Sequence, residues 1–106
     1  MTQAFYISEG YTAARFREQT LDHTTPARPI ETWGQPENVR ATLSAHNAVI
    51  AALARQYEHV IFVDQDRLIP KSQTYFRDIC HLTAKGSQQF VENIRDQILA
   101  FMRVQP

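Results

Sequence analysis

The sequence predicts an α/β fold in which two parallel strands are flanked by long helices. Two short apolar runs, at residues 4–7 and 60–63, are rich in the aromatic and β-branched side chains of buried strands. A long helical segment separates these runs, and an amphipathic segment follows the second one. Strand, helix and strand in this order are typical of a right-handed crossover between parallel strands. We therefore expect the C-terminal portion of a three-layer α/β/α parallel sheet.

The N-terminal part holds the first predicted strand and a long connection. Residues 4–7 end at a turn-like Ser-Glu-Gly cluster, and we expect this strand to be buried on both faces or nearly so. Residues 11–21 have a helical composition, with Phe16 and Leu21 as apolar side chains. Proline and glycine interrupt residues 22–36, which predicts a loop long enough to be functional.

Residues 36–57 contain the clearest helical pattern. Pro36 suits the first turn of a helix, and Glu37 suits the positive end of the helix dipole. His46 lies on the apolar stripe of this helix and is predicted to be a satisfied core histidine. The stripe has spacings of three and four residues and consists of Val39, Leu43, His46, Ile50, Leu53 and Tyr57.

The C-terminal part begins with the second predicted strand. Residues 60–63 are uninterrupted and mostly β-branched, so we expect them to be fully buried. Residues 65–82 are predicted to be irregular, with a helical turn near residues 66–69. Thr83 is predicted to cap a final helix that runs to Val104. One face of this helix carries Val91, Ile94, Ile98 and Met102, with Phe90 and Phe101 beside them.

Length and charge limit the classes of function. The 106 residues, 1–106, are predicted to form one small, partial α/β domain. Eleven basic and eleven acidic side chains give a formal net charge of zero, which argues against nucleic-acid binding and against a polybasic membrane-surface segment. No apolar run has the length of a bilayer span, and residues 1–10 lack the features of a signal peptide. The compartment is therefore unknown, and a cytoplasmic location is expected only if Met1 is the natural start.

Cysteine and histidine are too sparse to predict a metal site. Cys80 is the only cysteine, which excludes an internal disulfide and a thiolate metal site. The histidines at 23, 46, 59 and 81 lack the close pairs that zinc sites use. We therefore expect no metal and no cofactor. Cys80 is predicted to point away from its neighbours and to have a buried packing role.

The residues with the clearest chemical pattern are Asp78 and His81, three positions apart in a loop before the final helix. In serine hydrolases an imidazole removes the serine proton, and a carboxylate holds the other ring nitrogen. Because residues this close in a loop can turn toward each other, Asp78 is predicted to be the orienting acid and His81 the general base. The alternative is that Asp78 only caps the helix and His81 is an ordinary surface or core residue.

The pattern D-x-x-H-L-T-x-x-G, at residues 78–86, resembles the last sequence block of the SGNH (GDSL-type) hydrolases. The resemblance extends upstream to Asn47, Ala54 and residues 60–64. It implies an SGNH-like, flavodoxin-like parallel sheet, with Asp78 and His81 as two members of a catalytic triad. It also implies that the full enzyme cleaves an ester or acetyl ester of a lipid, carbohydrate or small molecule without a cofactor.

The chain differs from the family in the sequence blocks that carry the catalytic serine and the oxyanion hole. The Gly-Asp-Ser block, the oxyanion-hole Gly and the Gly-x-Asn-Asp segment do not occur. We therefore expect the chain to be inactive alone and to bind an ester substrate only if an N-terminal half completes it. Ser8 follows the first predicted strand and precedes Glu9-Gly10, but it lacks the glycine that should precede the serine of a nucleophile elbow and fits a turn better. Ser44, Ser72 and Ser87 have no motif around them.

A rival interpretation starts from the incomplete sheet. Two parallel strands do not form a sheet that is stable alone, so partner strands are expected from a missing N-terminal half, a second copy of the chain or another subunit. The chain would then be a non-catalytic α/β module that homo-oligomerises or binds a partner protein through its open sheet edge.

Overall fold

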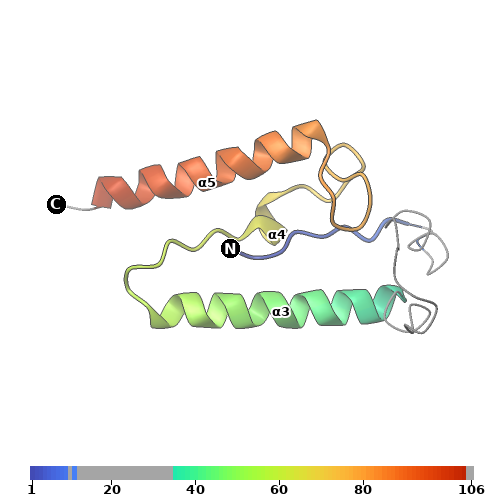
Figure 1. The fold of residues 1–106 in the computed structure, drawn as a ribbon, viewed down its shortest axis with the longest axis horizontal. Helices are drawn as coiled ribbons and strands as arrows, with labels where there is room; N and C mark the ends of the chain where they lie inside the picture. The colour runs from blue at the N-terminus through green and yellow to red at the C-terminus, as the bar shows by residue number, and fades with distance from the viewer. Residues whose placement is uncertain (10, 12–34, 105–106) are drawn as a thin grey trace, which may run out of the picture.

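The computed structural model describes residues 1–9, 11 and 35–104 and contains three helices in this part of the chain (Figure 1). They are α3 (Pro36–Gln56), the single-turn α4 (Gln65–Leu68) and α5 (Ala84–Val104). The N-terminal segment and the segment that leads from α3 to α4 are extended, and both lie between the two long helices (Figure 1). In this described part, the helices lack the uninterrupted apolar length that a bilayer crossing requires.

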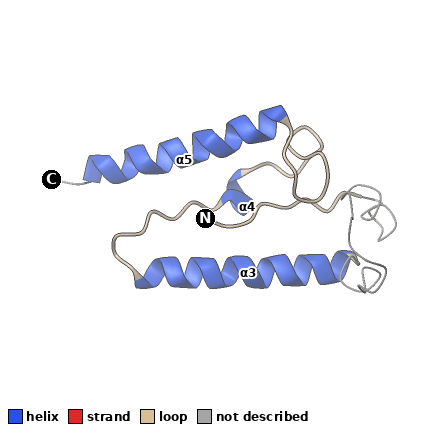
Figure 2. Ribbon diagram, in the orientation of Figure 1, coloured by secondary structure: helices blue, strands red, loops and turns tan. Residues whose placement is uncertain are grey.

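The predicted parallel-sheet α/β fold is wrong for the residues that the structure describes. They form helices and loops without a named strand (Figure 2). Their β-type pairing is an isolated antiparallel bridge between Phe76 and Leu82. No backbone hydrogen bond joins residues 4–7 to residues 60–63; the nearest one runs from Thr2 N, before the first predicted strand, to Val63 O at 3.1 Å. A parallel ladder requires evenly repeated bonds, so the three-layer arrangement and the partial α/β domain are replaced by a mainly helical chain.

In the N-terminal segment, side chains form the backbone hydrogen bonds that a neighbouring strand would otherwise form. The Asn47 side chain on α3 donates to Gln3 O at 2.8 Å and accepts from Gln3 N at 2.7 Å. Phe5 N donates to the Asp66 carboxylate at 3.4 Å, and Lys71 donates to Phe5 O at 2.6 Å. These bonds satisfy the N-terminal segment without a ladder, which is why it remains a loop.

The long helices begin and end close to their predicted bounds. Pro36 stands in the first turn of α3, as expected. Thr83 caps α5: its Oγ1 accepts from Gly86 N at 3.0 Å and donates to Thr74 O at 2.6 Å. The helical turn expected near residues 66–69 is α4. The helix predicted at 11–21, apart from Tyr11, and most of the predicted loop at 22–36 lie outside the described residues.

The buried interior consists of two small clusters and a polar connection. Gln65 on α4 is fully buried; it accepts from Asn93 at 2.8 Å and donates to Phe90 O at 3.0 Å, which joins α4 to α5. One apolar cluster consists of Tyr11, Val39 and Ile79, and the other of Ala4, Ile69 and Phe76.

Much of the predicted core surface is exposed. On α3, Leu53 is 47% exposed and His46 is also exposed, so the core-histidine prediction is wrong. On α5, Val91 is 62% exposed. The predicted full burial of residues 60–63 is wrong too, because only Val63 is buried. The Cα radius of gyration is 16.1 Å, whereas a compact domain of this length has about 13 Å. No second layer therefore covers these apolar side chains within the described chain.

Candidate functional site

The candidate site lies on the loop between α4 and α5. Arg77 N donates to His81 O at 2.8 Å, and Thr83 N donates to Tyr75 O at 3.0 Å. Together with the bridge between Phe76 and Leu82, these bonds close a tight loop whose tip is formed by residues 78–80. The loop is therefore held by its own backbone before any side chain at its tip is considered.

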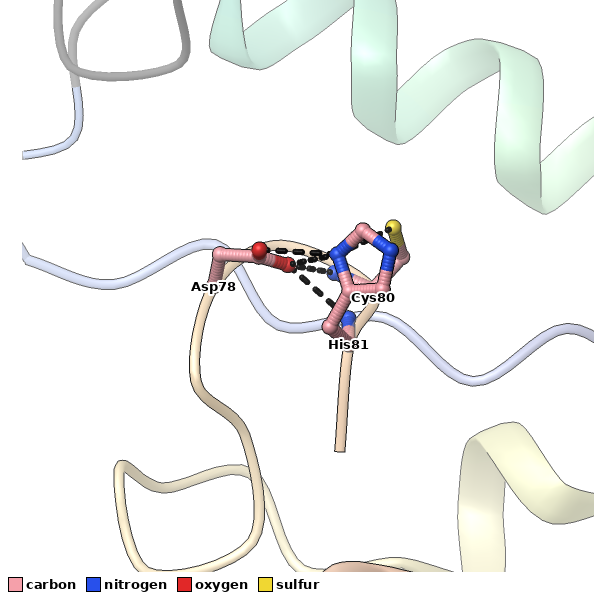
Figure 3. A group of neighbouring side chains, drawn as sticks. All are labelled: Asp78, Cys80 and His81. Atoms are coloured by element: carbon pink, nitrogen blue, oxygen red, sulfur yellow. Dashed lines mark hydrogen bonds and ion pairs between the residues drawn. The ribbon is translucent and has the colours of Figure 1, made fainter. Parts of the chain in front are cut away.

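The structure brings Asp78 and His81 together, as the sequence predicted (Figure 3). Asp78 Oδ1 accepts the backbone N–H groups of Cys80 at 3.0 Å and of His81 at 2.8 Å. Asp78 Oδ2 lies 2.8 Å from His81 Nδ1. The Asp78 side chain is 10% exposed, whereas that of His81 is 65% exposed. A fixed, mostly buried carboxylate thus holds an imidazole at the surface.

The charge of Asp78 determines which ring nitrogen of His81 carries the proton. Burial by itself raises the pKa of Asp78, but the hydrogen bonds from the two backbone N–H groups and from His81 outweigh it. The pKa of Asp78 therefore lies below its ordinary value. An ionised carboxylate only accepts hydrogen bonds, so Nδ1 donates and Nε2 of the neutral ring is left as the acceptor. A general base requires this tautomer.

A cleft of about 340 Å³ lies beside Asp78 and includes Ser8 among its lining residues, but not His81. The cleft therefore does not place Ser8 against the imidazole. All four serines, at positions 8, 44, 72 and 87, lie in the described residues, and none of them is hydrogen bonded to His81. The loop thus presents an acid and a base without a serine nucleophile.

Cys80 does not point away from its neighbours, so that prediction is wrong. Its Sγ atom is half-buried and lies 3.8 Å from His81 Nδ1. Burial and the negative charge of Asp78 raise the pKa of the thiol, which makes it a poor nucleophile. Sequence reasoning overlooked this contact, although three metal-ligating residue types within the four residues 78–81 could have indicated it.

Cys80 also lines an apolar groove of about 500 Å³ between the loop and α3. Val39, Leu43 and Ile79 supply its apolar surface, and His46 lies at its side. The groove is lined by Cys80, the residue before His81, and offers space for an apolar group on that side of the loop.

The surroundings of Gly86 explain why the D-x-x-H-L-T-x-x-G pattern ends in glycine. A Cβ atom at this position would overlap the backbone carbonyl oxygen of Tyr75 and lie 3.1 Å from Leu82 Cβ. The absence of a side chain lets the first turn of α5 pack directly on the loop. This glycine therefore positions the helix against the segment that carries Asp78 and His81.

Two further carboxylates, Asp64 and Asp66, have structural roles. Asp64 caps α4 by accepting from Arg67 N at 3.4 Å, and it also accepts from Thr2 Oγ1 at 2.9 Å. Asp66 forms an ion pair with Lys71. Both carboxylates therefore tie the N-terminal segment and α4 together.

Comparisons of the chain with protein-family models, with curated proteins and with solved structures gave no match. A functional assignment therefore depends on the geometry of residues 70–86.

Proposed function

We propose that this chain supplies the acid and the base of a serine-type ester hydrolase, with Asp78 as the orienting acid and His81 as the general base. The observation that carries this proposal is the 2.8 Å contact between Asp78 Oδ2 and His81 Nδ1. The carboxylate is anchored and mostly buried, while the imidazole is exposed to an incoming group. The likeness of residues 78–86 to the last block of the SGNH hydrolases supports the same assignment.

In the proposed reaction, His81 Nε2 takes the proton of a serine hydroxyl as that oxygen attacks the ester carbonyl carbon. The imidazolium then gives the proton to the departing alcohol, and water repeats the sequence to release the acid and regenerate the serine. Asp78 stays ionised throughout and stabilises the positive charge on the ring. Its lowered pKa is consistent with that role.

The serine and the oxyanion-hole donors are proposed to come from another polypeptide segment. The four serines of the chain are not bonded to His81, and the sequence lacks a Gly-Asp-Ser block. The apolar groove beside Cys80 has the size to take the acyl or alcohol part of a small ester. The isolated chain is therefore expected to be inactive on unactivated esters.

The first test is hydrolysis of p-nitrophenyl acetate and of ethyl acetate by the purified chain. Because Asp78 holds His81 Nδ1 and leaves Nε2 at the surface, His81→Ala is expected to lower p-nitrophenol release more than the loss of any other exposed histidine. His59→Ala is the matched control, because His59 is another exposed histidine, on the turn after α3, and its loss should lower the rate less than the loss of His81. Equal rates in wild type and His81→Ala would contradict the proposed role of His81.

A fluorophosphonate probe tests where the nucleophile comes from. We expect no serine adduct on the isolated chain. An adduct mapped to Ser8 would replace the proposal by a complete hydrolase that uses its own serine.

A second candidate function is self-association through apolar helix faces, which is favoured by the exposure of large apolar side chains. Because the described residues form no sheet, the helix faces take the place of the open sheet edge considered above. Apolar surface of this extent commonly marks an interaction site. The residues are Val49, Leu53, Tyr57, Val60 and Ile61 at one end of α3, and Val91, Ile98, Leu99, Met102 and Val104 on α5.

Sedimentation velocity over a range of concentrations tests this second function. A dimer that dissociates on dilution is expected. A monomer at every concentration would remove the self-association proposal and would leave the acid–base proposal unaffected.

A further inference from the structure

We propose that Asp78, Cys80 and His81 bind a single zinc ion through a carboxylate oxygen, a thiolate sulfur and the imidazole Nδ1 atom. One ligand atom from each of the three side chains lies within 4.8 Å of the other two (Figure 3). All three ligands come from the tip of the loop between α4 and α5. This proposal does not depend on the ester-hydrolase proposal.

The two separations that involve His81 Nδ1 are close to those of a tetrahedral zinc site. Zinc–ligand bonds of about 2.0 Å to nitrogen and oxygen and about 2.3 Å to sulfur place nitrogen and oxygen about 3.3 Å apart and sulfur and nitrogen about 3.6 Å apart. The observed separations are 2.8 Å between His81 Nδ1 and Asp78 Oδ2, and 3.8 Å between His81 Nδ1 and Cys80 Sγ. Small rotations of the Asp78 and His81 side chains, which separate this nitrogen and oxygen by about 0.5 Å more, therefore suffice.

The surroundings of the ligands hold two of them in place. Asp78 Oδ1 is occupied by the backbone N–H groups of Cys80 and His81, which orients the carboxylate and leaves Oδ2 for a cation. Cys80 packs against the buried cluster that contains Val39 and Ile79, which restricts the position of its sulfur. The exposed side of His81 leaves a fourth coordination position open to water.

The mixture of donor atoms selects the class of metal. A thiolate and an imidazole favour zinc or cobalt, whereas magnesium and calcium prefer sites made of oxygen ligands. From the sequence, a thiolate metal site was excluded because the chain has a single cysteine, but one cysteine excludes only an all-thiolate site and is compatible with a site that combines sulfur, nitrogen and oxygen.

Zinc binding and the base role of His81 are mutually exclusive. A zinc ion on Nδ1 removes the hydrogen bond to Asp78 and leaves the ring proton on Nε2, so Nε2 no longer accepts a proton. Zinc would therefore act as an inhibitor of any reaction that uses His81 as its base.

Cobalt titration of the tag-free, chelator-treated chain is the direct test. Because Cys80 is the only cysteine, a thiolate-to-cobalt charge-transfer absorption reports this residue alone. The expected result is a band that saturates at one cobalt per chain and disappears when zinc displaces the cobalt. Absence of the band, or saturation at one metal per two chains, would overturn the proposal.

Three variants and one control test the ligand set by calorimetric zinc titration. Cys80→Ser, His81→Ala and Asp78→Asn are each expected to weaken zinc binding by about tenfold or more, a typical cost of disturbing a metal site. The asparagine keeps one oxygen for the backbone N–H groups and replaces the other, the proposed zinc ligand, by an uncharged NH2 group that only donates hydrogen bonds. His59→Ala should bind zinc like wild type, and circular dichroism should show unchanged helix content in all four. Equal losses in His59→Ala and His81→Ala would overturn the proposal.

The zinc experiments and the ester experiment test the two proposals independently, so one proposal can be contradicted while the other is kept. A chain that binds zinc without accelerating p-nitrophenyl acetate cleavage keeps the metal site and loses the base role. A chain with His81-dependent cleavage and no cobalt band keeps the base role and loses the metal site.

Discussion

Two regions of the molecule differ in how many of their side chains contact other residues. One is the loop at residues 70–83, and the other is the outer faces of α3 and α5. In the loop, Asp78 accepts two backbone N–H groups and Thr83 both donates and accepts. No buried side-chain nitrogen or oxygen lacks a partner within the described chain. On the helix faces, large apolar side chains such as Leu53 and Met102 remain exposed. The comparison teaches that nearby residues specify the loop, whereas the described residues leave the apolar side chains of the helix faces exposed.

The largest predicted effect is on the packing of α5 against the loop. Gly86→Ala would place a methyl group on the Tyr75 carbonyl oxygen, and we expect the free energy of unfolding to fall by about 3 kcal/mol. Alanine normally favours a helix over glycine by about 1 kcal/mol, so the sign of the effect is diagnostic. Urea unfolding measures it, with the exposed neighbour Ser87→Ala as a control that should change little. A Gly86→Ala variant as stable as wild type would show that the helix does not pack closely on the loop.

A smaller loss is expected when the N-terminal segment is released from α3. Asn47→Ala leaves the backbone N–H and C=O of Gln3 without their partners, which should cost about 2 kcal/mol of unfolding free energy. Hydrogen exchange at the Gln3 amide should become faster in the same variant. His46→Ala, one position earlier and exposed, is the matched control. Unchanged exchange in Asn47→Ala would mean that the segment is not held by this side chain.

The acid dependence of stability tests how firmly the loop holds Asp78. The pKa of Asp78 is lower in the folded chain than its ordinary value of 3.8, so the folded state binds this proton less readily than the unfolded state. Its contribution to stability is therefore complete above that ordinary value and is lost as the pH falls through the lowered folded value. The difference in unfolding free energy between wild type and Asp78→Asn should shrink below about pH 4. A difference that stays constant down to pH 2 would contradict the anchored carboxylate.

The smallest effects on stability are expected on the exposed faces. Leu53→Gln and Val91→Gln should each change the unfolding free energy by no more than about 0.5 kcal/mol, as at other exposed positions. Urea unfolding at low protein concentration is the appropriate measurement. A loss of unfolding free energy near that of Asn47→Ala would show that the helix faces are covered in solution. The loop and the faces would then no longer differ as described above.

Local rules predicted the helices and the acid–base pair. Pro36 in a first turn and Thr83 at a cap are signals that act within a few residues. From them, the N-terminal ends of α3 and α5 were predicted correctly. Asp78 and His81 were correctly expected to meet because they share one loop, and the structure shows their contact. Their chemical role stays a prediction.

Features that depend on residues far apart in the sequence could not be predicted from local patterns. The run at residues 60–63 has the composition of a buried strand, but a strand also needs a neighbour, and Thr2 supplies only one backbone bond. The buried pair of Gln65 and Asn93 consists of polar side chains whose burial follows from their mutual hydrogen bond. The direction of Cys80 depends on the twist of its loop, which the residue order alone does not specify.

The most direct measurement of the central claim is the protonation of the His81 ring by nitrogen NMR on the labelled, chelator-treated chain. At about pH 8, where an unperturbed imidazole is neutral, wild type is predicted to carry its proton on Nδ1 and to leave Nε2 unprotonated. Asp78→Asn removes the anionic acceptor and should shift the ring toward the Nε2–H tautomer. A wild-type ring protonated on Nε2, with the same spectrum in Asp78→Asn, would contradict the account of Asp78 as the residue that prepares His81 to act as a base.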